Sequence, residues 1–224
     1  MGIDIARADG IVLSHGHYDH CGGLPSFPGN APMPPVYVGA GALDGKYKTG
    51  KKHPVAIGIP WSPSDHPRIA QSIVVNDKNL SIAPGVTLHA DIPCTVPFEG
   101  TPQGFFTGNH ENLKPDTMRD EQMLVFARSE TIDVILGCSH PGIINCLTYA
   151  KSLYPGKRLG TVLAGMHLKE ASAARINETI LRLEAKSIDL LIPMHCTGLA
   201  AICRMSRDMG ETCRPMCVGQ TIDV

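Results

Sequence analysis

Short apolar runs separated by polar or glycine-rich residues fill the first 136 positions of the chain and predict a series of short strands. Asn-Asp and Pro-Gly turn signals separate three of these runs, so we expect residues 73–75, 80–82 and 86–89 to form a small antiparallel meander. Residues 39–68 and 99–122 lack a clear period and are expected to be long irregular segments. The remaining predicted strands cover residues 11–13, 36–38, 123–127 and 132–136.

The pattern changes after Gly137 to strand, short loop and helix, repeated three times. The predicted strands are 132–136, 159–163 and 188–192, and the predicted helices are about 142–153, 171–186 and 199–209. The helix at 171–186 has the clearest period, with Ile176, Ile180, Leu181 and Leu183 expected on one face. Strands that alternate with helices indicate a layered α/β architecture, and we expect one domain spanning residues 1–224.

Histidines recur where the predicted strands end. The first apolar run, 11–13, leads into the motif H-x-H-x-D-H, and single histidines follow the strands after Gly137. The carboxyl ends of neighbouring strands meet at one edge of an α/β sheet, so these side chains should converge there. The converging residues are His15, His17, Asp19, His20, His140, His167 and His195.

Such a cluster indicates a metal site. Imidazole and carboxylate groups suit zinc, manganese or iron, and a dense group of neutral histidines has little use without a cation. A lone histidine at a strand end is more often structural, but composition alone would produce this motif with a chance of about one in a thousand.

The bulk composition excludes some partners. A net charge of −1 gives no surface excess for nucleic acid or an anionic membrane, and no apolar run is long enough to span a bilayer. Without a recognisable signal segment we expect a cytoplasmic protein. The eight cysteines are scattered and should be reduced, with Cys213 and Cys217 a weak zinc signal better explained as incidental thiols.

A basic cluster lies within the segment 39–68. It consists of Lys46, Lys48, Lys51, Lys52 and His53, and could serve an anionic substrate. Charge runs usually remain solvated, so a surface loop is the favoured interpretation.

Four motifs together resemble the metallo-β-lactamase superfamily. They are H-x-H-x-D-H at 15–20, GCSHPGIIN at 137–145, AGMHL at 164–168 and HCTG at 195–198. The last three are similar to the branch of 7,8-dihydropterin-6-methyl-4-(β-D-ribofuranosyl)aminobenzene 5′-phosphate synthases. The resemblance implies the α/β (α+β layered) class and an αβ/βα four-layer sandwich with a dinuclear metal site.

The same resemblance implies specific ligands. His15, His17 and His140 would hold one divalent metal, and Asp19, His20 and His195 the second. Zinc is favoured, and manganese, iron or magnesium are compatible.

His167 departs from the superfamily pattern, which usually has a bridging aspartate at this position. A neutral imidazole offers one lone pair and cannot bridge two metals through one nitrogen. We therefore expect His167 to be a terminal ligand or, with Asp19, a proton-transfer residue, with any bridging left to water.

The implied activity is that of a metal-dependent hydrolase or a pterin-condensing synthase. Its substrate would be a small anionic molecule, phosphorylated and pterin-like in the second case. The alternative is a non-catalytic metal-binding relative that acts as a binding or partner protein.

Superfamily members normally have several strands before the metal motif, including an acid that braces it. Almost nothing precedes residue 11 here, so we expect a chain that is N-terminally truncated relative to the family. A complementing N-terminal chain or a homo-oligomer would then cover the open sheet edge.

Overall fold

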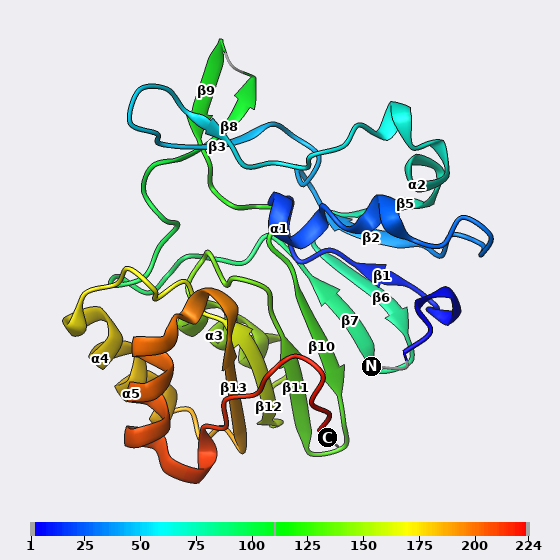
Figure 1. Cartoon of the computed structure of the whole chain (residues 1–224). Coiled ribbons are helices and arrows are strands. Elements are labelled where there is room, and N and C mark those ends of the chain that lie inside the picture. Colours follow the sequence, from blue (N-terminus) through cyan, green and yellow to red (C-terminus); the bar gives the residue numbers. More distant parts are fainter. Residues whose placement is uncertain (1–2, 110, 223–224) are drawn as a thin grey trace.

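A six-stranded mixed sheet forms the centre of the computed structural model, which describes residues 3–109 and 111–222 (Figure 1). Its order is β13-β12-β11-β10-β7-β6. Strands β11, β12 and β13 run parallel, and the other neighbours are antiparallel. The strands are β6 (Asn79–Ala83), β7 (Val86–His89), β10 (Met123–Ala127), β11 (Thr131–Ile135), β12 (Arg158–Gly165) and β13 (Leu190–Met194).

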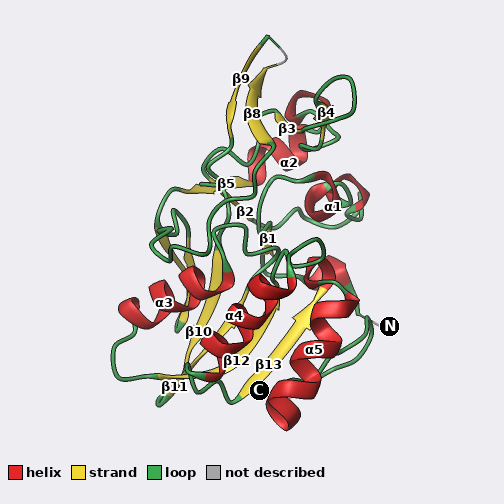
Figure 2. Cartoon of the chain, turned by 90° about the vertical axis from the view of Figure 1, so that its left-hand side faces the viewer, coloured by secondary structure: helices red, strands yellow, loops and turns green. Residues whose placement is uncertain are grey.

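Three helices cover one face of this sheet: α3 (Ile143–Leu153), α4 (Ala173–Glu184) and α5 (Leu199–Met209) (Figure 2). They agree with the helices predicted from the apolar period. The Ser172 side chain caps α4 by accepting a hydrogen bond from the Arg175 amide at 3.2 Å, which satisfies one of the free amides of the first turn. No helix within the described residues is long and apolar enough to cross a membrane.

A smaller, all-parallel sheet of β1 (Ile11–Val12), β2 (Val36–Gly39) and β5 (Ile73–Asn76) lies beside the large one. The short helices α1 (Tyr18–Cys21) and α2 (Pro67–Ser72) accompany it. Leu13, Val36, Val38 and Ile69 form a second apolar cluster, so α2 packs on this sheet. The resulting order of helices, sheet, sheet and helices is that of the predicted αβ/βα sandwich.

A third sheet, of order β4-β3-β8-β9, projects beyond the two layers (Figure 1). It contains β3 (Lys46–Lys48), β4 (Val55–Ala56), β8 (Phe105–Asn109) and β9 (Asn112–Pro115). Short 3-10 helices complete the chain at Ile5–Arg7, Leu24–Ser26, Pro63–Asp65, His195–Thr197 and Gly210–Thr212.

Three expectations from the sequence were wrong in detail. Residues 73–75 belong to β5, which pairs in parallel with β2 and not with the β6–β7 hairpin. The segments 39–68 and 99–122 are not wholly irregular, because β3 pairs with β8 across more than fifty residues. Such long-range pairing leaves little periodic signal in strands of three to five residues.

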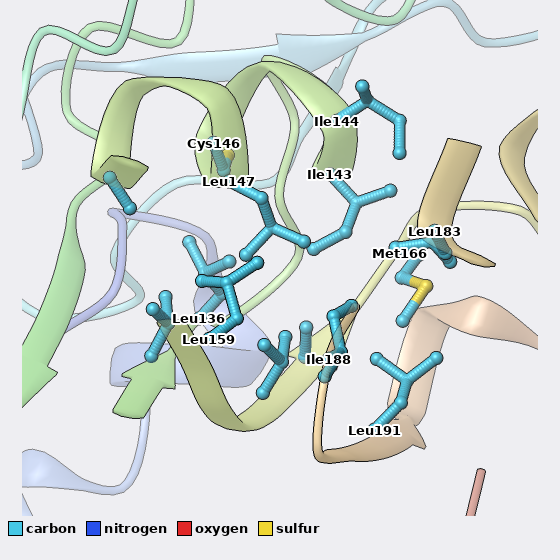
Figure 3. Packing of buried hydrophobic residues seen from close by; sticks show 14 of the residues in the cluster. Leu136, Ile143, Ile144, Cys146, Leu147, Leu159, Met166, Leu183, Ile188 and Leu191 are labelled. Atoms are coloured by element: carbon cyan, nitrogen blue, oxygen red, sulfur yellow. The ribbon is translucent and has the colours of Figure 1, made fainter. Parts of the chain in front are cut away.

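The main apolar core lies between the large sheet and α3, α4 and α5 (Figure 3). Leu147 and Leu183 project into it from α3 and α4 and are fully buried. The prediction that Leu181 shares this buried face was wrong: Leu181 is 60% exposed, because residues two positions apart on a helix do not lie on the same face.

We predict that Leu183→Ala lowers the free energy of unfolding by about 2–5 kcal/mol, because it leaves a cavity in this core. Leu181→Ala is the matched control, since it makes the same change in the same helix, and it should change stability by less than about 0.5 kcal/mol. Urea unfolding followed by circular dichroism measures both. Equal losses for the two variants would contradict the packing described here.

Candidate metal centre

The structure brings all seven residues of the predicted cluster to one edge of the sheets. His15 and His17 follow β1, His140 follows β11, and their ring centroids are 4.6–4.9 Å apart. His20 and His167 lie against these rings, with centroids 4.2 Å from His15 and 4.9 Å from His140, and Asp19 and His195 lie beside His20. Asp19 and His20 come from α1, His167 from the loop after β12 and His195 from the end of β13.

His15, His17 and His140 form a buried triad whose ligand atoms lie within 4.8 Å of one another. The Nε2 atoms of His15 and His17 have no hydrogen-bond partner among the described residues. Burial lowers the pKa of His17 to about 2 and that of His15 well below its usual value, so both rings are neutral with a free lone pair. Two unpaired, buried imidazole nitrogens within one triad fit a metal ion, which would satisfy both.

Asp19, His20 and His195 form a second, more open group with ligand atoms within 4.8 Å. The Nε2 atoms of His20 and His195 are 3.1 Å apart, and the Asp19 carboxylate lies 3.5 Å from the Nε2 atom of His195. The Ser14 hydroxyl is hydrogen-bonded to Nδ1 of His20 at 3.2 Å, which leaves Nε2 for a ligand role. Both groups correspond to the ligand sets implied by the family resemblance.

The buried carboxylate of Glu121 orients the first triad. It accepts hydrogen bonds from Nδ1 of His140 at 2.6 Å and from the amides of Cys138 and Ser139 at 3.2 and 2.8 Å. Burial alone would lower the pKa of His140, but the charge and hydrogen bond of Glu121 outweigh it and raise that pKa. With Nδ1 held as a donor, the Nε2 atom of His140 is directed to the centre.

A second buried carboxylate, Asp120, holds the metal-motif loop. It accepts a hydrogen bond from the Gly16 amide at 2.8 Å, and the Lys46 ammonium donates to Asp120 and Asp116 at 2.7 and 2.9 Å. Burial alone would lower the pKa of Lys46, and the two carboxylates outweigh it and raise that pKa. Lys46 is therefore a buried structural cation, and its assignment to a solvated or substrate-binding loop was wrong.

The strand ends have an unusual backbone conformation. Ser139, His167 and His195 adopt left-handed φ values of 52°, 49° and 50° after β11, β12 and β13. Non-glycine residues rarely adopt this conformation, and it clusters at functional sites. Gly165 is required between these ends, because a β-carbon there would collide with the carbonyl oxygen of Gly137.

Two cysteines beside the histidine motifs also belong to the centre, although the sequence analysis gave them no role. The Cys138 sulfur lies 3.2 Å from Nε2 of His20, and the Cys196 sulfur accepts a hydrogen bond from the His167 amide at 3.2 Å. A hydrogen bond from the Cys138 thiol lowers the pKa of Cys196. Cys138 stands two residues before His140 and Cys196 directly follows His195, and this proximity is the sequence feature that could have indicated a place in the centre.

Cys213 and Cys217 lie apart from the centre. Cys213 is buried and its sulfur lies 3.8 Å from the Ser206 hydroxyl, whereas Cys217 is exposed. Neither belongs to a group of possible metal ligands in the described part of the chain.

A pocket of about 380 Å³ opens onto both triads. Phe105 of β8 forms one wall, with its ring centroid 5.9 Å from that of His167 and 5.7 Å from that of His17. Lys48 and Lys169 line this pocket and an adjoining cavity of about 610 Å³. Of the predicted basic cluster, Lys48 alone lines these two cavities.

Comparison with known proteins agrees with this geometry. The sequence model of the metallo-β-lactamase superfamily matches residues 1–101. A solved structure described as a metal-dependent hydrolase of the β-lactamase superfamily has a TM-score of 0.83 and 26% identity, and the alignment covers all of this chain and 81% of that one. An isothiocyanate hydrolase from Delia radicum gut bacteria, 13% identical, shares the fold with a TM-score of 0.57 and coverage of 100% and 80%.

Two relatives come from Methanocaldococcus jannaschii. The 7,8-dihydropterin-6-methyl-4-(β-D-ribofuranosyl)-aminobenzene-5′-phosphate synthase is 26% identical over 221 residues, covering 90% of this chain and 70% of that protein. An uncharacterized protein is 29% identical over 200 residues, covering 89% and 73%.

The fold and the two histidine-rich triads define a protein of mixed sheets and helices with a site suited to divalent metals. The chain is therefore similar to the metallo-β-lactamase superfamily, in sequence over residues 1–101 and in fold over its whole length.

We predict that Glu121→Gln weakens metal binding by about 10- to 100-fold, because the amide no longer provides a charged acceptor for His140. Competition with a chromophoric chelator measures the affinity. Glu99→Gln is the matched control: Glu99 is also buried and accepts hydrogen bonds from the amides of Ile144 and Asn145, but it lies outside both triads. Equal losses of affinity in both variants would show that Glu121 acts only through general stability.

Proposed function

We propose that this protein is a metal-dependent enzyme that uses a dinuclear centre to act on a phosphorylated small molecule. The observation that carries the proposal is the pair of triads at the floor of one pocket, of which the buried one has unpaired imidazole nitrogens. His15, His17 and His140 would hold one divalent metal, and Asp19, His20 and His195 the other. Zinc suits this donor set best.

A pair of divalent metals supplies charge neutralisation and an activated water at neutral pH. The protein residues contribute the remaining functions. Glu121 and Ser14 orient the ligand imidazoles, and the closely packed strand ends keep the two triads adjacent. His167 lies beside His140, with ring centroids 4.9 Å apart, on the exposed side of the pocket where it can exchange protons with a substrate.

Features of the pocket beyond the triads support an anionic substrate with a planar ring. Lys48 and Lys169 provide two cations that phosphate oxygens can contact. The Phe105 ring provides a flat apolar wall opposite His167. These properties suit a phosphate ester, and they also suit the pterin and aminobenzene phosphate groups named in the relative from Methanocaldococcus jannaschii.

The principal test is metal content together with hydrolysis of bis-p-nitrophenyl phosphate. We expect stoichiometric metal, loss of activity with a chelator and recovery when zinc is returned. His140→Ala should remove metal and activity together, because it deletes a ligand of the buried triad. His89→Gln is the control, since His89 is equally buried but is bonded to Asn79 and Tyr154 away from the centre, and it should retain its metal.

Two other outcomes distinguish the alternatives. Release of diphosphate from a pterin methyl diphosphate, dependent on an aromatic amine that carries a ribosyl phosphate, would identify the condensing activity of the synthase relative. Tight stoichiometric metal without turnover of either substrate type would instead favour a non-catalytic binding protein.

We further predict that Lys48→Ala and Lys169→Ala each raise the KM for a phosphorylated substrate about tenfold, because each removes a charged hydrogen-bond donor from the pocket. Metal content should not change. Lys51→Ala, in the same segment but outside both cavities, is the control. Steady-state kinetics with each variant provide the measurement, and an unchanged KM in both pocket variants would exclude this role.

A further inference from the structure

Cys138 lies between the two triads. Its sulfur falls within 4.8 Å of the ligand atoms of His15 and His20 in one group, and of His140 and His167 in another. A third group joins it to His195 and Cys196. The Cys138 sulfur is therefore close to ligands of both proposed metal positions, and among the five groups of possible ligands it is the residue that recurs most often.

The separations around this sulfur fit metal coordination. Zinc–nitrogen distances of about 2.0–2.1 Å and zinc–sulfur distances of about 2.3 Å place neighbouring tetrahedral ligands about 3.3–3.7 Å apart. Cys138 Sγ lies 3.2 Å from Nε2 of His20, which in turn lies 3.1 Å from Nε2 of His195. A small expansion of this group would accommodate a shared ion.

We propose that Cys138 releases its thiol proton to solvent on metal binding and supplies a thiolate shared by the two metal positions. The inference rests on the dinuclear centre proposed above and adds a protein ligand to it. A thiolate sulfur has several lone pairs and can contact two metals, whereas the imidazole of His167 has one free lone pair. Cys138 is also buried, so its sulfur faces the centre and not bulk solvent.

Cys196 does not have the same position. Its sulfur accepts the His167 amide hydrogen bond and lies 3.7 Å from the Cys138 carbonyl oxygen, so backbone groups surround it. It occurs in one of the five groups, and that group also contains Cys138. Cys196→Ser is therefore the matched control for Cys138→Ser.

X-ray absorption at the zinc edge tests the proposal directly. In the wild-type protein loaded with one and then two equivalents of zinc, we expect one sulfur for every zinc at about 2.3 Å in both samples. A sulfur bound to a single metal would give one sulfur for every two zincs in the fully loaded sample. That result, or a coordination sphere of nitrogen and oxygen alone, would overturn the proposal without any variant.

The variants separate the two cysteines. Cys196→Ser should keep one sulfur for every zinc, and Cys138→Ser should lose the sulfur signal while thermal melting reports whether it remains folded. A halved sulfur count in Cys196→Ser would show two separate thiolate ligands and overturn the sharing. Wild-type protein that binds no zinc would defeat the proposed function itself, whereas two zincs without sulfur would defeat this inference alone.

Discussion

Two adjacent buried carboxylates, Asp120 and Glu121, connect the parts of the chain that form the centre. Asp120 holds the Gly16 amide and the Lys46 ammonium, and Glu121 holds His140 and the backbone before it. Buried carboxylates are costly unless their oxygens are paired, and here every contact fixes an element that carries or supports a proposed ligand. The positions of the metal-motif loop, β3 and the end of β11 therefore depend on one short segment.

This arrangement explains why the centre is compact although its residues come from distant parts of the chain. The parallel strands β11, β12 and β13 end at the same edge, and each is followed by a residue in a left-handed conformation. That strain is compensated by close packing at Gly137 and Gly165 and by the large apolar core beneath the sheet. The third sheet then adds Phe105 and Lys48 to the pocket, and Lys169 joins them from the loop after β12.

The donor set also gives the two triads different properties. In the first triad, burial lowers the pKa values of His15 and His17, whereas the second triad includes the exposed groups Asp19 and His195 at the pocket wall. A buried group suits permanent ligation and an open one suits exchange with solvent or substrate. Asp120 braces the metal-motif loop through the Gly16 amide, and Glu121 orients His140.

The sequence by itself determined the three C-terminal strand–helix units, the resemblance to the superfamily and the group of seven residues that converge. These follow from local period and from the rule that parallel strands end at one edge, both of which depend on few contacts. The tertiary structure alone decided the pairing of β2 with β5 and of β3 with β8, the burial of Lys46, the role of Glu121 and the central position of Cys138. Each of these depends on residues brought together by long-range packing, which a linear pattern of short strands does not encode.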